Sequence, residues 1–482
     1  MKYEPVIGLE VHAQLLTKSK IFCRCSTSFG AKPNSQTCPI CLGMPGVLPV
    51  LNKLAVEFAI KIALATNCRI AENSIFARKN YFYPDLPKGY QISQYEEPLS
   101  ENGYVEIDID GARKRIGITR IHLEEDAGKS IHAEEFVEEN ETLVDVNRCG
   151  TPLIEIVGKP EIRSPKEAYL YLTRLRQIVQ YLEICDGNME EGSFRCDANV
   201  SIRRQGSKEF GVKTELKNMN SLHGVEKALE FEIARQIQTL KAGGNVFQQT
   251  LLWDADKKET IPMRSKEFAH DYRYFPEPDL VPVQIKSEWI EKVRHSLPEL
   301  PAVRRERLVE KYGLPQYDAD ILTETKALVD YFEETTKISG DAKTTSNWIM
   351  GEVLRVLKGS GRDIKDFKIK PADLAALIKL IIDGRISVKI AKSVFDEMFT
   401  SGRKPDEIIK EKGLLQISDS TELEKYVLSV IDENPEEVNK FLSGHEQVLG
   451  FLLGQIMKAT RGKANPKLIN EILRKELQKA KP

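Results

Sequence analysis

Two close pairs of cysteines near the N-terminus constrain the fold of this chain more than any other feature. Cys23 and Cys25 are separated by one residue, and after twelve further residues comes Cys38-Pro-Ile-Cys41. This spacing is typical of a zinc site with four thiolate ligands. Four thiolates complete a tetrahedral shell and leave no open position for a substrate, so we expect a structural zinc. Disulfides, or a cysteine cluster without metal, are the alternatives.

The remaining cysteines and the absence of targeting signals indicate the compartment. Eight cysteines in 482 residues are too few for a dense disulfide framework, and their pairing favours metal in a reducing compartment. We expect the other four, Cys68, Cys149, Cys185 and Cys196, to be ordinary buried thiols. The sequence shows no cationic leader and no apolar run approaching the roughly 20 residues that span a bilayer. A cytoplasmic protein without membrane contact is therefore expected.

Length and composition predict a globular protein of several domains. A chain of 482 residues exceeds the usual size of one core, and 41% hydrophobic with 29% charged residues excludes bulk disorder. Residues 1–292 mix strand-like alternation with helices, including an amphipathic helix from Ser164 to Glu183 that has Pro165 at its first position. Later residues follow a helical pattern, with a break at 401–405. We expect domains over 1–292, 293–405 and 406–482.

Helix starts in the last of these regions can be predicted from local sequence. Asn434-Pro435 and Asn465-Pro466 each offer an N-cap residue followed by a proline in the first turn. The helix after Pro466 carries basic residues on its polar face, which could contact phosphates.

Polar and apolar residues alternate in four segments of the first domain. In the first segment Glu10, His12 and Gln14 share one face of a strand, and the apolar residues between them share the other. The other segments are 116–126, 195–203 and 212–217. Such strands place one face in a core and leave the other face for ligands or solvent.

These polar faces and their ends supply oxygen and nitrogen ligands. The candidates are Glu10, His12, Glu124, Glu125, Glu190, Glu191, Asp197 and Glu215. Such a set suits Mg²⁺, which proteins usually hold through a few carboxylates together with waters and phosphate oxygens. The cations placed to neutralise phosphates are Lys79, Arg120, Lys213 and Lys217. The alternative is a solvated face with exposed ion pairs, but His12, two residues from Glu10, favours a metal site.

Two segments, 76–90 and 271–276, interleave aromatic and basic residues. This pattern is typical of surfaces that bind single-stranded nucleic acid, and the alternative is that the rings pack the loops of an irregular core. A phosphate-binding loop is excluded at Gly128-Lys129-Ser130, because Leu123 stands where the motif requires its first glycine.

Eight groups of residues, spread over most of the chain, resemble one family, the B subunits of aspartyl/glutamyl-tRNA(Asn/Gln) amidotransferase. They are Ile7–His12, the two cysteine pairs, Tyr81–Gln91, Leu123–Lys129, Asp145–Glu155, Asn188–Ser201, Glu215–Ser221 and Tyr272–Leu280. The resemblance implies an α+β cradle domain with a mainly antiparallel sheet and a zinc-binding loop. All-α helical and tail domains follow it, and the tail domain binds tRNA.

The resemblance also implies an activity and partners. Family members belong to a heterotrimeric carbon–nitrogen ligase that uses ATP and takes its amide nitrogen from glutamine. ATP phosphorylates the side-chain carboxylate of Glu-tRNA(Gln) or Asp-tRNA(Asn), and ammonia then displaces phosphate to give Gln-tRNA(Gln) or Asn-tRNA(Asn). The implied partners are the amidase (A) subunit, which makes the ammonia, the small (C) subunit, the misacylated tRNA and the cognate aminoacyl-tRNA synthetase.

On this resemblance we expect Glu10, His12, Glu124 and Glu125 to be the catalytic residues and the magnesium ligands. The expected ATP-binding residues are Lys79, Glu190, Glu191, Asp197, Lys213 and Glu215. The expected zinc ligands are Cys23, Cys25, Cys38 and Cys41. The rival hypothesis is a zinc-stabilised tRNA-binding scaffold with the chemistry on a partner, against which the alternating carboxylate faces argue.

Overall fold

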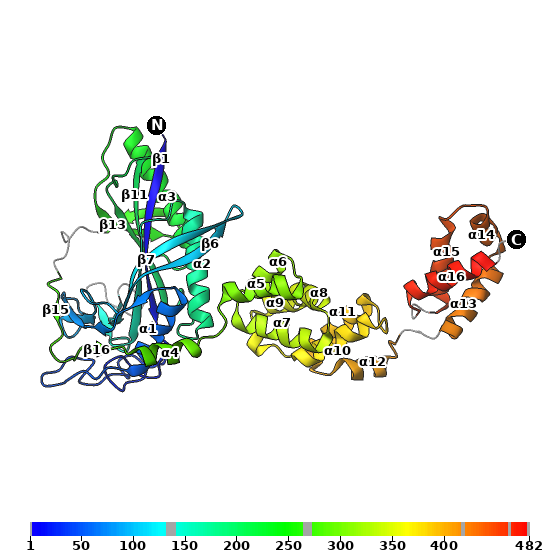
Figure 1. Cartoon of the computed structure of the whole chain (residues 1–482), viewed down its shortest axis with the longest axis horizontal. Coiled ribbons are helices and arrows are strands. Elements are labelled where there is room, and N and C mark those ends of the chain that lie inside the picture. Colours follow the sequence, from blue (N-terminus) through cyan, green and yellow to red (C-terminus); the bar gives the residue numbers. More distant parts are fainter. Residues whose placement is uncertain (1, 132–140, 264–271, 416–419, 461–463, 480–482) are drawn as a thin grey trace. The chain divides into compact units, whose positions relative to one another are not determined.

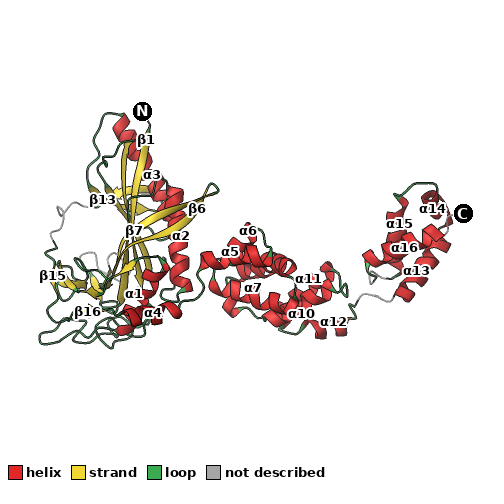
Figure 2. Ribbon diagram, viewed as in Figure 1, coloured by secondary structure: helices red, strands yellow, loops and turns green. Residues whose placement is uncertain are grey.

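A computed structural model of the chain describes residues 2–131, 141–263, 272–415, 420–460 and 464–479 (Figure 1). The chain divides into two compact units, residues 1–301 and 302–482. Strands and helices make up the first unit, whereas the described part of the second is helical (Figure 2). The predicted α+β region followed by a helical region is therefore confirmed. None of the described helices is long and apolar enough to cross a membrane.

The first unit ends later than residue 292 because its last helix packs into it. This helix, α4 (Ser287–His295), contacts α1 (Lys53–Ala65). The indole Nε1 of Trp289 donates a hydrogen bond of 3.2 Å to Glu57 Oε1, and the ammonium of Lys53 lies 5.4 Å from the centre of the Trp289 ring.

A central sheet of nine strands runs through the described part of the first unit. In spatial order the strands are β14 (Glu259–Pro262), β13 (Gln249–Asp254), β12 (Thr214–Lys217), β11 (Phe194–Arg204), β1 (Tyr3–Gln14), β10 (Pro152–Gly158), β7 (Ala112–Glu125), β6 (Ser100–Ile109) and β2 (Arg69–Ile70). Only β12 and β13 pair in parallel, and the other neighbours are antiparallel. The prediction of a mainly antiparallel sheet is confirmed.

One face of the central sheet is a hydrophobic core. Ile7, Leu9 and Val11 of β1 are buried, as the alternation predicted. They belong to one cluster with apolar side chains of α1, α2 (Pro165–Tyr181) and α3 (Leu222–Lys241). These helices therefore cover the apolar face, and α2 and α3 pack against each other on it (Figure 1).

Three smaller sheets complete the first unit. They pair β15 (Phe275–Pro276) with β4 (Ala77–Asn80) and β4 with β5 (Tyr90–Ser93), β16 (Val283–Gln284) with β3 (Asn73–Ser74), and β8 (Lys129–Ile131) with β9 (Leu143–Asp145). The first sheet joins the two aromatic and basic segments, because Phe275 lies opposite Arg78. Phe76 packs edge-on against Phe22 in the core, whereas Phe82 is 88% exposed. The rings thus serve both core and surface, and Asp271 lies outside the described residues.

The second unit contains two groups of helices, each with its own packing. The first group comprises α5 (Pro301–Tyr312), α6 (Gln316–Leu322), α7 (Lys326–Ser339), α8 (Ala342–Trp348), a π-helical turn (Ile349–Val353), α9 (Leu354–Ser360), a 3-10 turn (Ile364–Asp366), α10 (Pro371–Ile382), α11 (Val388–Ser401) and α12 (Pro405–Lys412). The second comprises α13 (Ser420–Glu433), α14 (Pro435–Leu442), α15 (Val448–Ala459) and α16 (Pro466–Lys479), which share one core. Because α12 packs against α10 and α11, it belongs with the first group, although the predicted boundary precedes it.

Of the two predicted N-caps, the one at Asn465 is present and the one at Asn434 is not. Ser164 caps α2, its Oγ accepting the amide of Glu167 at 3.2 Å, with Pro165 in the first turn as predicted. Asn465 accepts the amide of Leu468 at 3.4 Å at the start of α16. The side-chain cap predicted for α14 is wrong, because the side-chain amide of Asn434 instead donates to the backbone carbonyl of Val430 at 2.8 Å.

Replacing Ser164 by alanine tests how α2 is anchored. An N-cap of this type contributes about 1 kcal/mol, which corresponds to a roughly fivefold change in an opening equilibrium. We expect amide hydrogens in the first turn of α2 to exchange about fivefold faster, measured by hydrogen–deuterium exchange. Ser164→Asp keeps an acceptor and should exchange like wild type, so equal acceleration in both variants would contradict the capping role.

Candidate functional site

The register of the central sheet lines up polar side chains from four adjacent strands. His12 of β1 lies opposite Glu155 of β10 on one side and opposite Arg195 of β11 on the other. Glu155 in turn lies opposite His122 of β7. Residues that face each other across an antiparallel pair point to the same side of the sheet. These four side chains therefore form one row on the face opposite the hydrophobic core.

Four members of this face form a tight group, which we call the histidine–carboxylate cluster: His12, His122, Glu124 and Glu155. Nε2 of His12 lies 3.6 Å from Glu155 Oε2 and 3.8 Å from Glu124 Oε1. Nε2 of His122 lies 3.2 Å from the same Glu155 oxygen and 3.8 Å from Glu124 Oε2. One ligand atom each from His12, Glu124 and Glu155 lie within 4.8 Å of one another, close enough to hold a single metal ion.

Mutual attraction favours the charged forms of all four groups of the cluster despite their burial. Burial favours the neutral forms, but the carboxylates outweigh it and raise the pKa of His12, and that of His122 to about 9. Burial likewise acts to raise the pKa values of Glu124 and Glu155, yet the two imidazoles hold both below their usual value. A metal ion could take the place of the protons in such a cluster, because its ligands must be deprotonated to bind metal.

Two other predicted site residues lie beside the cluster. Lys79 of β4 is held over the ring of Tyr272, with its Nζ 4.8 Å from the ring centre. Burial opposes its charge, but Glu124 leads the groups that raise the pKa of Lys79. Glu10 accepts a hydrogen bond of 3.0 Å from the side-chain amide of Asn199. Burial, together with the charge of Glu155, raises the pKa of Glu10.

A buried acid holds the neighbouring part of the face in place. Asp126 follows β7 and accepts two hydrogen bonds from Arg195, at 3.0 and 3.1 Å, and one of 2.6 Å from Gln14. Burial acts to raise the pKa of Asp126, but Arg195 and Arg148 outweigh it and lower the pKa to about 2. Arg195, which lies opposite His12, is thereby fixed.

Five predicted ATP-binding residues lie in other surroundings. Lys217 donates to Asp197 at 2.9 Å and lies 3.1 Å from Glu215, so these two carboxylates are already paired. Lys213 is exposed and, with Glu10, lines a pocket of about 270 Å³. Glu190 and Glu191 are exposed in the turn before β11, outside the cluster.

Glu125, predicted to share a site with Glu124, contacts other groups in this structure. Consecutive residues of a strand point to opposite faces, and both glutamates lie in β7. Glu125 forms an ion pair with Lys88 and accepts the backbone amide of Ile92 at 2.8 Å. It lines a cavity of about 80 Å³ that Cys41 also lines and that His12 does not.

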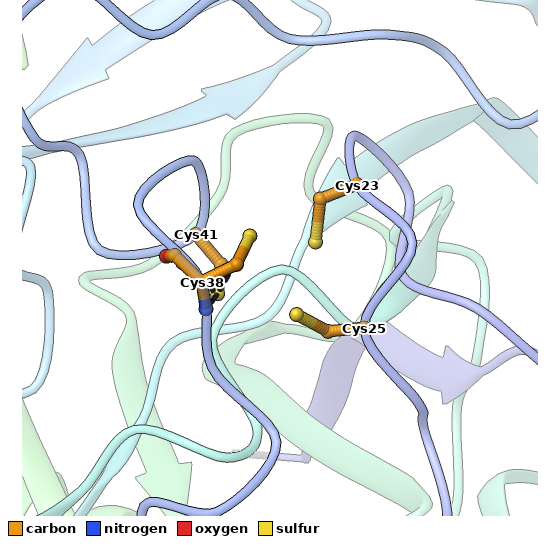
Figure 3. Close-up of side chains that lie close together, drawn as sticks. All are labelled: Cys23, Cys25, Cys38 and Cys41. Carbon is orange, nitrogen blue, oxygen red and sulfur yellow. Dashed lines mark hydrogen bonds between the residues drawn. The ribbon is translucent and has the colours of Figure 1, made fainter.

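The four predicted zinc ligands converge at one place. The Sγ atoms of Cys23, Cys25, Cys38 and Cys41 lie within 4.8 Å of one another (Figure 3). Cys23 and Cys25 come from one loop, and Cys38 and Cys41 from another (Figure 3). Hydrogen bonding within the group, led by the thiol of Cys23, lowers the pKa of Cys41 to about 4. All eight cysteines carry free thiols, and the other four are buried as predicted.

Comparison with known proteins agrees with this organisation. Residues 5–291 match the family described as GatB/GatE catalytic domain, and residues 330–477 match the one described as GatB domain. The B subunit of aspartyl/glutamyl-tRNA(Asn/Gln) amidotransferase from Thermodesulfovibrio yellowstonii is 59% identical over 99% of this chain and 100% of its own length. The protein of the same name from Carboxydothermus hydrogenoformans is 58% identical over 99% of both chains. The chain belongs to the family of these amidotransferase B subunits.

Members of this amidotransferase family are parts of a tRNA-dependent ligase complex that uses glutamine and serves protein biosynthesis. The histidine–carboxylate cluster and the four cysteines both lie in the stretch that matches the catalytic domain. This amidotransferase chain thus carries its two candidate metal sites in one unit.

Two members of the cluster, Glu155 and His122, were not among the predicted ligands, although the alternation placed His122 on the face of Glu124. A signal for Glu155 was present, because it is a single acid between Ile154 and Ile156 in an otherwise apolar strand. His122 alternates with Ile121 and Leu123 and therefore had to share the face of Glu124. Neither position reveals its cross-strand neighbours, which only the register supplies.

Replacing Asp126 by asparagine tests the buried pair with Arg195. We expect the free energy of unfolding of the first unit to fall by about 2 kcal/mol, because a partly buried cation loses its partner. The pKa of Asp126 is lower in the folded chain than in the unfolded chain. Its contribution to the free energy of unfolding is therefore complete above about pH 4 and is lost as the pH falls toward 2. The measurement is proteolysis of this unit across a urea series.

The matched control is Asp108→Asn, which removes a half-exposed acid of the same sheet that pairs with Arg174 of α2. Exposed pairs contribute little, so a change below about 0.5 kcal/mol is expected. Equal losses in the two variants would contradict the role given to Asp126.

Proposed function

We propose that the polar face of the central sheet carries the phosphorylating and amidating site of the complex, with ATP and Mg²⁺ bound around the histidine–carboxylate cluster. The observation that supports this most is that ligand atoms of His12, Glu124 and Glu155 lie within 4.8 Å of one another beside the half-buried Lys79. Perturbed titratable groups gathered on a concave or open face are typical of active sites.

The reaction of the family proceeds in two steps. An oxygen of the Glu or Asp side chain esterified to tRNA attacks the γ-phosphorus of ATP, and the bond to the bridging oxygen breaks, so an acyl phosphate and ADP form. Ammonia then attacks the acyl carbon, phosphate leaves with the electron pair of the broken C–O bond, and the nitrogen loses a proton to give the amide. The first step brings a carboxylate against a polyanion, so it requires positive charge.

The residues on this face fit that requirement. One imidazole and two carboxylates are a donor set that accepts Mg²⁺, and Mn²⁺ as well, because imidazole suits the softer ion. When bound, the metal would neutralise phosphate charge between the nucleophile and ATP. Ser93 donates to Glu124 at 3.2 Å and His122 contacts Glu155, so both carboxylates are oriented by neighbours. Lys79 would contact a phosphate.

The other predicted residues take more distant roles in this proposal. Glu10 borders the cluster and would hold water on the metal or the incoming substrate. Lys213 would contact phosphate at the mouth of the pocket that it shares with Glu10. Asp197 and Glu215, which Lys217 pairs, would support the floor of the site rather than bind a cation themselves.

The four cysteines would bind a structural Zn²⁺. Their Sγ atoms meet within 4.8 Å, and soft thiolates favour this metal in a closed tetrahedral site. The zinc would hold the loops of residues 23–41 against the end of β1, and it would take no part in the reaction.

Partners complete the proposed function. Ammonia would come from the amidase partner, with the small partner bracing it, along a path shielded from water because an acyl phosphate hydrolyses readily. The unpaired acceptor end of Glu-tRNA(Gln) or Asp-tRNA(Asn) would stack on rings such as Tyr83, which is half exposed. Helices α13–α16 would contact the body of the tRNA.

The central test is Glu155→Gln in the complex assembled with the amidase and the small partner. With free ammonia supplied, which bypasses glutamine hydrolysis, we expect ATP-dependent formation of Gln-tRNA(Gln) to fall about a hundredfold, because a charged ligand is lost. The Mg²⁺ concentration for half-maximal rate should rise, and the Kd for tRNA should not change.

Glu101→Gln is the matched control, because Glu101 lies in the same sheet and pairs with Arg69 at the surface. It should retain full activity. If Glu155→Gln and His12→Ala both retained full activity as well, the chain would be a zinc-stabilised tRNA-binding scaffold with the chemistry on a partner.

A chain that ends at residue 415 tests the tail. This cut keeps α12 with α10 and α11, against which it packs, and removes α13–α16. We expect the Kd of the complex for tRNA to rise at least about tenfold and to depend less steeply on salt, because phosphate contacts are lost. Glutamine hydrolysis by the amidase partner should be unaffected, and unchanged tRNA affinity would count against a role for the tail.

A further inference from the structure

A lysine is completely buried beside the four cysteines. Lys20 has 0% exposure and is among the largest fully buried side chains. An isolated ammonium group in a protein interior costs several kcal/mol unless other groups compensate its charge. Within the described part of the chain no carboxylate forms an ion pair with Lys20, so the compensation has another source.

The partners of the ammonium point to the cysteine cluster. Nζ of Lys20 donates to the backbone carbonyl of Gln36 at 2.8 Å and to Sγ of Cys41 at 3.6 Å. Both acceptors belong to the loop that carries the second cysteine pair. A carbonyl offers only a dipole, whereas a thiolate offers a full negative charge, so the sulfur is the group able to balance the lysine.

The backbone holds Lys20 in this position. Its amide donates to the carbonyl of Cys25 at 3.0 Å, and the next amide, of Ile21, donates to Gly150 at 2.8 Å. Asn52 contacts the carbonyl of Lys20 at 3.4 Å. The backbone of Lys20 is therefore fixed at the position from which its side chain reaches Cys41.

A role for Lys20 as the partner of the nearby Glu125 does not fit the contacts. Glu125 lines the same cavity of about 80 Å³. Its carboxylate is already held by the ammonium of Lys88 and the backbone amide of Ile92. The charge of Lys20 is thus available to the sulfur side of the cavity.

We propose that Lys20 is the counter-charge of the four-cysteine site and that its N–H···S bond to Cys41 helps the protein retain zinc. This inference rests on the zinc assignment made above. Zn²⁺ with four thiolates carries two net negative charges, which are costly to bury, and a fixed ammonium offsets part of that cost.

The same contacts distinguish Cys41 from the other ligands. Its sulfur accepts the backbone amide of Cys38 at 3.1 Å as well as the ammonium of Lys20. Two donors, one of them positively charged, hold this sulfur in place, so its bond to the metal should be the least readily broken. Loss of Lys20 should remove that protection, which would appear as faster loss of metal.

The experiment measures zinc itself in the assembled complex. The variants are Lys20→Met, which keeps the length but removes charge and donor, and Lys20→Arg, which keeps both. Lys18→Met is the control, because Lys18 is an exposed lysine two residues earlier. Zinc content is determined by elemental analysis, and zinc release by a chromogenic chelator after the complex is diluted into it.

We expect Lys20→Met to release zinc at least about tenfold faster than wild type, within the range known for groups that orient metal ligands. Lys20→Arg and Lys18→Met should release it at rates near that of wild type. After exchange with Co²⁺, the thiolate-to-metal absorption band should shift in Lys20→Met alone. If this variant does not accumulate as folded complex, Lys20→Gln removes the charge while keeping a donor and is measured in the same way.

The outcomes separate the two claims. Zinc in wild type with equal release rates in all variants would overturn the role of Lys20 and leave the zinc site standing. A wild-type complex purified with zinc in the buffer that nevertheless holds none would overturn both the zinc assignment and this inference.

Discussion

The register of β1 between β10 and β11 is the constraint on which the rest of the first unit depends. It sets His12 between Glu155 and Arg195, and it sets Leu9 and Val11 into the core on the other face. A slip of one residue would turn every side chain of β1 over, which would place imidazole and carboxylates in the core and leucines on the polar face. Because long antiparallel pairing on both sides of β1 fixes this register, the histidine–carboxylate cluster is as well determined as the core.

The sequence predicted those features that depend on one strand or one loop. Alternation in β1 predicted the faces of Glu10 and His12, and cysteine spacing predicted a group of four thiols that the structure brings together. The same rule of alternation directs Glu125 to the side of β7 opposite Glu124, which the predicted ligand set did not take into account. By contrast, whether Asn434 caps its helix could not be predicted, because its amide donates to a carbonyl in the preceding helix.

Features that depend on several strands could not be predicted from the sequence. The eight candidate ligands look equivalent as residues, yet cross-strand neighbours divide them. Lys217 pairs with Asp197 and Glu215, whereas Glu124 faces two imidazoles. Only strand order and register decide which carboxylate lies beside a lysine and which beside a histidine, and both are long-range properties. The absence of Glu155 from the predicted set has the same origin.

The two faces of the central sheet differ in what they contribute to stability. Buried ion pairs seldom stabilise a fold, since desolvation of the charges cancels much of their attraction. The polar face, with its buried imidazoles, carboxylates and Lys79, therefore contributes little to the free energy of folding and can even oppose it. The apolar face beneath it, packed against α1, α2 and α3, supplies the hydrophobic burial that compensates. The buried Lys20 beside the four thiols follows the same rule. Burying its ammonium group does not stabilise the fold, and in our proposal its charge offsets that of the neighbouring thiolates.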